Sequence, residues 1–183
     1  MNGTMASLSV NGKNYEVLRL LGKGKGGYSY LVTDGKTNYV LKQIHHEICS
    51  YYTFGDKVEA EMEAYRKLSG IGIPMPVLLD LDRPEERILK EFIDGETIYE
   101  LLLKNVMKES YLKQMESMSK RLQRCNTNID YFPTNFVVRE EMMYYVDYEC
   151  NDYMAKWSFE NWGISYWSRT PLFLEYASAH KSE

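Results

Sequence analysis

Short apolar and β-branched segments separated by turn signals fill most of the first ninety residues. Asn11-Gly12 lies between SLSV and NYEVLRLL, and Asp34-Gly35 lies between YSYLVT and NYVLKQI. Both dipeptides tolerate the positive φ angles of a tight hairpin turn. VLLDL and RILKEFI are two further strand-like segments. We therefore predict a small antiparallel sheet in this half of the chain.

The period of the pattern changes over residues 56–68, where DKVEAEMEAYRKL carries apolar residues at helical spacing. Glu61 falls on the apolar face of this predicted helix, whereas Glu59 and Glu63 point away from it. A carboxylate on a buried face needs a partner. Lys42, inside the strand-like YVLKQI, is a cation that is also costly to bury unpaired. The apolar residues that define the helix face are Val58, Met62, Tyr65 and Leu68.

The second half of the chain begins with two segments of helical spacing, residues 96–107 and 109–125. Two strand-like segments follow, FVV at 136–138 and MMYYV at 142–146, with REE as the turn between them. The tail from residue 151 onward is rich in aromatic residues and contains all three tryptophans. We expect it to act as a dense core plug, with an exposed apolar surface as the alternative.

Three oxygen-bearing side chains lie around the predicted hairpin of the second half. Asp130 and Asn135 bracket the loop NIDYFPTN, and Asp147 follows the second strand. The hairpin brings its two ends side by side, so these side chains can converge on one cation. Magnesium prefers hard oxygen ligands of this kind.

Composition and charge narrow the classes of function. Hydrophobic residues make up 44% of the chain and charged residues 26%, as in ordinary globular proteins. A net charge of −4 argues against a protein built mainly to neutralise nucleic-acid phosphates. Three cysteines without metal-ligand spacing, Cys49, Cys125 and Cys150, are expected to be free thiols. The first residues lack a signal-peptide core and no apolar run is long enough to span a membrane, so we expect a cytoplasmic protein.

The segment LLGKGKGGYSYLV carries Gly22, Gly24 and Gly27 in G-x-G-x-x-G spacing. In a Rossmann loop the segment after the glycines is a helix, but here an aromatic and β-branched run follows. The loop therefore joins strand to strand. A glycine-rich hairpin alone is a weak signal for phosphate binding.

The order of these features resembles that of the protein-kinase-like superfamily, over roughly residues 15–150. The resemblance implies that the glycine-rich segment covers ATP phosphates, that Lys42 holds the α and β phosphates, and that Glu61 pairs with Lys42. It also implies that KEFIDG is the hinge, where backbone groups near Glu91 and Ile93 hold an adenine edge. The implied fold is α+β and two-lobed.

The same resemblance assigns roles in the second half. NIDYFPTNFVV is similar to the catalytic loop, in which Asp130 orients the acceptor hydroxyl. Asn135 and Asp147 would bind Mg²⁺. The implied lobes are residues 1–92, an antiparallel sheet with one helix, and residues 93–183, a reduced and mostly helical lobe.

The sequence departs from the common protein-kinase pattern at two places. Asn128 stands where a histidine usually precedes the catalytic aspartate, and the metal triplet is Asp147-Tyr148-Glu149, without its glycine. Triplets with an acidic third residue are typical of aminoglycoside and choline phosphotransferase-like relatives. In its short length the chain is similar to small atypical kinases, including the one attached to the tRNA-threonylcarbamoylation machinery.

Two functions follow from the resemblance. The first is an ATP- and Mg²⁺-dependent phosphotransferase acting on a hydroxyl of a small molecule or of a protein serine or threonine. The alternative is a nucleotide-binding pseudokinase or regulatory ATPase that acts through a protein partner, for which the aromatic tail is a candidate surface. The presence of all five polar residues, Lys42, Glu61, Asp130, Asn135 and Asp147, favours the first.

Overall fold

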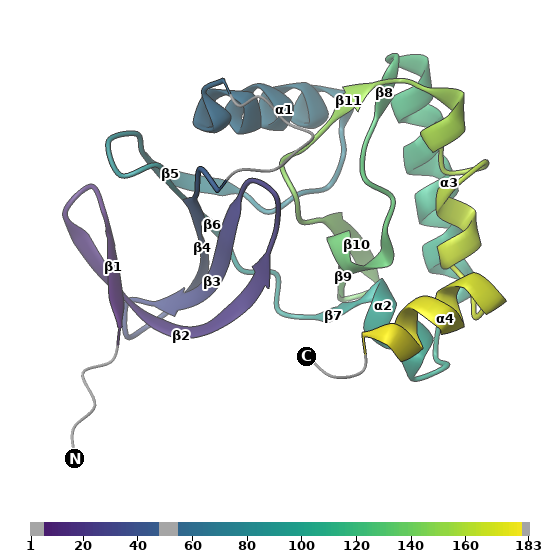
Figure 1. The fold of residues 1–183 in the computed structure, drawn as a ribbon, viewed down its shortest axis with the longest axis horizontal. Helices are drawn as coiled ribbons and strands as arrows, with labels where there is room; N and C mark the ends of the chain where they lie inside the picture. The colour runs from purple at the N-terminus through teal and green to yellow at the C-terminus, as the bar shows by residue number, and fades with distance from the viewer. Residues whose placement is uncertain (1–5, 48–54, 181–183) are drawn as a thin grey trace. The chain divides into compact units, whose positions relative to one another are not determined.

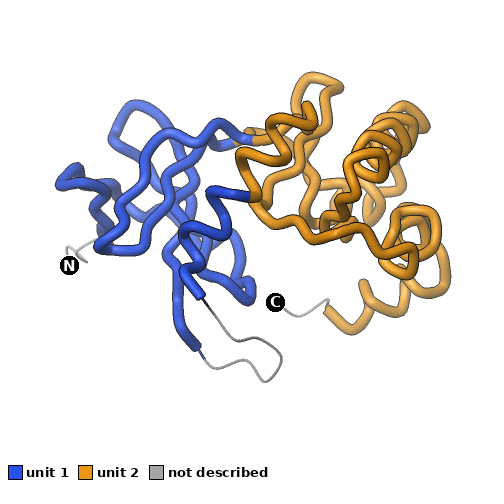
Figure 2. The backbone as a smooth tube through the Cα atoms, turned by 90° about the horizontal axis from the view of Figure 1, so that it is seen from above, with its two compact units in different colours: residues 1–63, 76–92 blue, residues 64–75, 93–183 orange. Residues whose placement is uncertain are grey.

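The computed structural model describes residues 6–47 and 55–180, so Cys49 lies outside the described part. The chain is a mixed α+β protein that divides into two compact units. Unit 1 contains residues 1–63 and 76–92, and unit 2 contains residues 64–75 and 93–183 (Figure 2).

Unit 1 is built on a curved antiparallel sheet with strand order β1-β2-β3-β4-β6-β5 (Figure 1). The predicted turn at Asn11-Gly12 forms, with φ angles of 47° and 79°. A small core on one face of the sheet includes Leu41 and Leu89, which pair across β4 and β6. The strands are β1 (Ser7–Val10), β2 (Lys13–Lys23), β3 (Gly27–Thr33), β4 (Asn38–Ile44), β5 (Leu78–Asp82) and β6 (Arg87–Glu91).

The predicted helix is present as α1 (Lys57–Ile71), and its apolar face is buried at Val58, Met62 and Leu68. Its end is set by Gly72. Gly72 has a φ of 80°, and the Ile73 amide donates to the Leu68 carbonyl at 3.0 Å. These two features define a Schellman motif, in which a left-handed residue terminates the helix.

Unit 2 combines a small antiparallel sheet with several helices that share one apolar core. β9 (Phe136–Arg139) pairs with β10 (Met142–Tyr145) and with β7 (Glu96–Thr97), while β8 (Thr127–Asn128) pairs with β11 (Asn151–Asp152). The core collects apolar side chains from the helices, the hairpin and the aromatic tail. The helices are α2 (Ile98–Leu103), α3 (Glu109–Arg124) and α4 (Pro171–Ala179), with short 3₁₀ turns η1 (Pro133–Asn135), η2 (Ala155–Trp157) and η3 (Gly163–Tyr166) (Figure 1).

The predicted helix over residues 96–107 was wrong at both ends. Glu96 and Thr97 form β7, and Thr97 caps α2 through a reciprocal capping box with Glu100. Asn105 ends α2 with a φ of 57°, and the Val106 amide donates to the Leu101 carbonyl at 2.9 Å. Asparagine tolerates this left-handed conformation, so Asn105 ends the helix. The apolar spacing alone had predicted that the helix continues to residue 107.

The aromatic tail combines the two roles that the sequence left open. Phe159, Trp167 and Phe173 are buried in the core of unit 2, whereas the Trp157 side chain is 45% exposed. The tail also contains α4, which the apolar pattern did not predict. Thr170 caps this helix by accepting from the Phe173 amide at 3.1 Å.

Two further observations concern the cysteines and the search for membrane-spanning helices. Cys125 and Cys150 are free thiols, as expected. Within residues 6–47 and 55–180, the helices are all too short or too polar to cross a membrane.

Candidate functional site

Lys42 and Glu61 form a buried ion pair in unit 1. The Lys42 ammonium lies 2.5 Å from Glu61 Oε1, and each side chain is only 11% exposed. Strand β4 provides the lysine, in the strand that the sequence pattern predicted, and α1 provides the carboxylate, on the helix face that the pattern indicated. Glu61 Oε2 is buried and has no hydrogen-bond partner among the described residues. A buried carboxylate oxygen without a hydrogen-bond partner costs stability.

The glycine-rich loop between β2 and β3 lies against this ion pair. A side chain placed at Gly26 would come within 3.6 Å of Glu61 Oε1 and 3.9 Å of Lys42 Nζ. Inside the loop, the Gly24 amide donates to the Gly27 carbonyl at 2.9 Å. Unit 1 therefore places bare backbone directly beside a buried lysine ammonium.

The fold requires glycine at some positions of this loop and not at others. A Cβ atom at Gly27 would lie 2.5 Å from the Gln43 carbonyl oxygen, so the pairing of β3 with β4 demands glycine there. A Cβ atom at Gly22 would meet nothing within 4 Å, and at Gly24 only the Gly27 oxygen at 3.9 Å. Neither residue has a positive φ. The described fold gives no steric reason for these two glycines, which leaves close approach by a ligand as a reason for them.

The predicted hinge residues fall at the end of β6 and beyond it. The Glu91 amide donates to the Val77 carbonyl at 2.9 Å, and the Val77 amide donates to the Glu91 carboxylate at 3.2 Å. The Glu91 amide is therefore committed within unit 1. Ile93 is buried and belongs to unit 2, and within the described ranges its backbone amide and carbonyl make no hydrogen bond.

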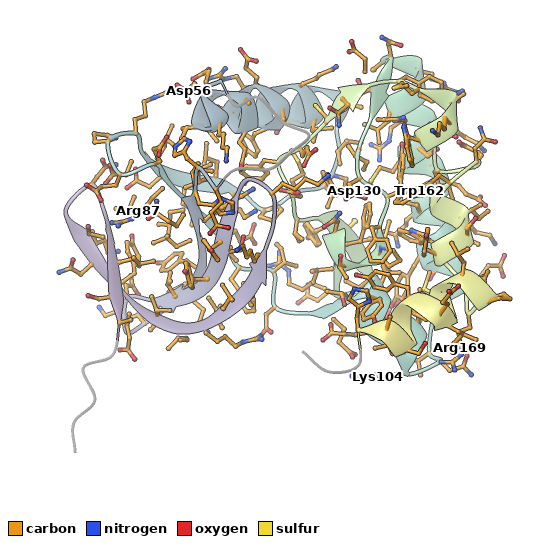
Figure 3. All side chains as sticks on the ribbon, viewed as in Figure 1. Asp56, Arg87, Lys104, Asp130, Trp162 and Arg169 are labelled. Atoms are coloured by element: carbon orange, nitrogen blue, oxygen red, sulfur yellow. The ribbon has the colours of Figure 1, made fainter. Side chains whose placement is uncertain are left out.

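Asp130 lies in the loop between β8 and η1 of unit 2 and is exposed (Figure 3). Its Oδ1 atom accepts a hydrogen bond from the Phe132 amide at 3.0 Å. The Asn135 side-chain amide donates to the Asp130 backbone carbonyl at 3.3 Å. These two bonds fix the loop around an exposed carboxylate.

The β9–β10 hairpin brings Asn135 and Asp147 together, as its register requires. Phe136 is opposite Tyr145, and the Val146 amide donates to the Asn135 carbonyl at 2.9 Å. Asp147 follows directly, and its Oδ1 atom accepts from the Tyr148 amide at 2.9 Å.

Gln114 of α3 and Lys108, the residue before this helix, support the tight turn of the hairpin. Glu140 and Glu141 occupy it with φ angles of 50° and 64°, which are uncommon for non-glycine residues. Gln114 holds the turn by donating to the Glu141 carbonyl at 2.9 Å, and Lys108 forms a salt bridge with the Glu141 carboxylate at 2.6 Å.

Tyr145 connects the acidic residues of unit 2 and was not predicted as a site residue. Its side chain is fully buried, and its hydroxyl donates to the Glu149 carbonyl at 3.0 Å. Burial raises the pKa of this phenol well above its usual value, and the negative charges of Asp147, Asp130 and Glu149 raise it further. The negative charges of these three carboxylates therefore all act on one buried hydroxyl.

Trp167 is a second residue that the sequence did not assign to the site. Its indole N–H donates to the Tyr131 carbonyl at 2.7 Å, one residue after Asp130. A side chain at Gly163 would lie 2.7 Å from the Tyr131 Cβ atom, so the tail approaches the loop as closely as glycine allows. The indole also packs on Phe136, with ring centroids 5.1 Å apart. No local sequence signal connects residues so far apart in the chain, so only the fold reveals this support.

The donor set of unit 2 fits magnesium in its chemistry. Asp147 offers a carboxylate, and Asn135 offers a carboxamide oxygen because its amide nitrogen binds the Asp130 carbonyl. Magnesium in nucleotide enzymes is held by one or two such protein ligands, with phosphate and water oxygens completing the shell. Among the described residues there is no group of three or more histidine, cysteine, aspartate or glutamate side chains placed to hold a metal by themselves.

The comparisons with known proteins do not identify a family for this chain. Neither a family model nor a curated protein sequence matches it.

Proposed function

We propose that this protein has a protein-kinase-like fold and transfers the γ-phosphate of ATP to a hydroxyl group. One observation carries the proposal. The buried Lys42–Glu61 pair lies directly beside the bare backbone at Gly26. A fixed cation under a glycine-rich loop supports the binding of nucleotide phosphates, because it offers a positive charge and backbone amides in the same place.

In this proposal unit 1 binds the phosphates of the nucleotide. Lys42 contacts the α and β phosphates, and Glu61 holds the ammonium in position. Gly22 and Gly24 allow the phosphates to approach the backbone. The hinge near Glu91 and Ile93 binds the base through backbone groups other than the Glu91 amide, which is bonded to the Val77 carbonyl. The Ile93 amide and carbonyl are suited to this role because no hydrogen bond within the described ranges uses them.

Unit 2 supplies the groups for the transfer step. Asp130 accepts or orients the proton of the attacking hydroxyl, and its exposure leaves room for an acceptor. Asn135 and Asp147 would hold Mg²⁺, which when bound neutralises charge on the phosphate oxygens. Tyr145 and Trp167 are positioning residues, since they fix the loop and the hairpin that carry the acidic side chains.

The test is incubation with γ-labelled ATP, Mg²⁺ and a panel of small-molecule and protein acceptors, with release of free phosphate measured alongside. We expect label transfer to one acceptor class, and saturating ATP-Mg²⁺ should raise the melting temperature by mass action. Asp130→Asn is the control for chemistry, since it should bind ATP without transferring the label. The proposal fails if the wild-type protein shows neither a thermal shift nor ATP binding by calorimetry.

The second candidate function is a nucleotide-dependent regulator that acts through a protein partner. Exposed apolar side chains in and near the aromatic tail favour it, because they present an apolar surface to solvent. Hydrolysis or tight ATP binding without transfer to any acceptor would support this alternative. The apolar side chains are exposed by 42–56% and belong to Met154, Trp157, Ile164, Leu172 and Leu174.

A further inference from the structure

The segment that follows β4 is bonded to the glycine-rich loop at several points. The His45 amide donates to the Gly26 carbonyl at 3.3 Å, and His45 Nε2 lies 3.0 Å from the Gly24 carbonyl oxygen. The His45 ring also lies beside Tyr28, which closes the loop, with centroids 5.0 Å apart. Two loop carbonyls are thus held by one residue.

The hydrogen bonds of the His45 ring define its tautomer. The Glu47 amide donates to Nδ1 at 3.3 Å, so Nδ1 is an acceptor and the proton is on Nε2. Nε2–H therefore donates to the Gly24 carbonyl. The bond orients the loop backbone, which has few side chains of its own to do so.

His45 also contacts the helix that carries Glu61. The Lys57 ammonium, in the first turn of α1, donates to the His45 carbonyl. Lys42 lies on β4, three residues before His45, which follows the end of the strand directly. One residue is therefore bonded to the loop and to α1 and is continuous with β4, the three elements that form the lysine site of unit 1.

We infer that His45 is a positioning residue that holds the glycine-rich loop over the Lys42–Glu61 pair. The inference deepens the proposed function and rests on it for its consequence in nucleotide binding. Glu47 adds a second, exposed connection, because Lys23 lies 2.7 Å from its carboxylate. That exposed pair is expected to contribute less than the half-buried ring.

Limited trypsin digestion without nucleotide tests the loop directly. Lys23 and Lys25 are exposed cleavage sites within it, and mass spectrometry can identify fragments that end at either lysine. Loss of one such hydrogen bond should raise the rate of these cleavages by roughly three- to tenfold in His45→Ala. His46→Ala is the matched control, because His46 bonds the Glu86 carboxylate at 2.7 Å instead of the loop. It should be cleaved at the wild-type rate.

Two further variants keep the test decisive if His45→Ala does not fold. In His45→Gln the side-chain amide reaches the position of Nε2 and can donate to Gly24, whereas in His45→Asn it reaches only the position of Nδ1. We expect near wild-type cleavage for glutamine and raised cleavage for asparagine. Equal rates in these two variants, or equal rates for His45→Ala and His46→Ala, would overturn the inference.

Binding measurements then separate this inference from the proposed function. The variants with raised cleavage should bind ATP-Mg²⁺ about three- to tenfold more weakly, with kcat changed by less than about twofold, because the loop holds phosphates and Asp130 is untouched. If the wild-type protein does not bind ATP-Mg²⁺, the proposed function fails, whereas the digestion still decides whether His45 holds the loop.

Discussion

The Lys42 ammonium and the Glu61 carboxylate lie 2.5 Å apart with only 11% of each side chain exposed. A buried ion pair contributes little net stability, because desolvation of the two charges offsets their attraction. Removing one partner is different, since it leaves the other charge buried and uncompensated. We therefore propose that the pair serves a role of the ammonium in a site rather than the stabilisation of unit 1.

Lys42→Met should lower both stability and activity. The variant leaves Glu61 as an unpaired buried carboxylate, and breaking such a pair costs about 3–5 kcal/mol. Denaturant unfolding would measure the loss, and labelled-ATP transfer would measure the activity. Lys113→Met is the control, because Lys113 pairs with Glu109 on the exposed surface of α3 and its loss should cost less than about 0.5 kcal/mol.

The double variant Lys42→Met/Glu61→Gln separates the two effects. It removes the unpaired charge, so most of the lost stability should return while phosphate binding stays impaired. Full phosphotransfer by Lys42→Met would mean that this lysine has been assigned the wrong role.

Alanine at Gly27 and alanine at Gly22 should give opposite results. The Cβ atom of Gly27→Ala would meet the Gln43 carbonyl at 2.5 Å and force β3 and β4 apart, at a cost of about 1–3 kcal/mol. Gly22→Ala meets nothing within 4 Å, so stability should be unchanged while ATP affinity falls. Thermal unfolding measures the change in stability, and calorimetry with ATP-Mg²⁺ measures the change in affinity. Unchanged ATP affinity in Gly22→Ala would remove the ligand-based explanation of this glycine.

The buried Tyr145 hydroxyl should make stability depend on alkaline pH. Its pKa in the folded protein is raised above the ordinary value of 10.0, chiefly by burial. The folded state then holds this proton more tightly than the unfolded state, so the contribution is complete below pH 10 and is lost as pH rises through the folded pKa. Tyr145→Phe should flatten the decline in unfolding free energy above pH 10. An identical decline in both proteins would show that other groups cause it.

Patterns along the chain were sufficient to place Lys42 and Glu61. Helical periodicity placed Glu61 on the buried face of its helix, and the apolar neighbours of Lys42 placed it in a strand; both side chains are buried. The Asn135–Asp147 neighbourhood also follows from local information, because a tight hairpin returns its second strand beside the start of the first. The predicted turn REE was one residue too long, since Arg139 belongs to β9 and pairs with Met142. These features depend on short segments whose geometry is set by their own residues.

Contacts between distant segments could not be predicted in this way. Trp167 bonds the Tyr131 carbonyl across 36 residues of sequence, and nothing in either segment specifies the other. The bond from His45 to Gly24 likewise depends on how the β2–β3 loop folds back beside the end of β4. Some missed features did have local signals. Thr170 before Pro171 is a common helix start, and Asn105 is a common helix stop.

Substitution of the two aspartates of unit 2 should separate metal binding from chemistry. Asp147→Asn removes a charge from a hard-cation site, so both Mg²⁺-dependent ATP binding and turnover should weaken. Asp130→Asn should leave ATP affinity nearly intact while kcat falls by roughly a hundredfold or more, as expected for loss of a general base. The two variants should be compared by their dissociation constants for ATP-Mg²⁺ and by their single-turnover rates.

The alternative explanation is that both aspartates only accept hydrogen bonds from neighbouring backbone amides. Asp130 accepts from the Phe132 amide and Asp147 from the Tyr148 amide, and loss of such a bond costs about 1 kcal/mol of stability. An asparagine side-chain oxygen can still accept these bonds, so Asn variants should keep near wild-type stability under either explanation. The free energy of unfolding is therefore the control measurement, and the turnover rate distinguishes a catalytic role from a structural one. Because the two bonds survive in the asparagine variants, a wild-type rate for Asp130→Asn would leave this carboxylate with a purely structural role.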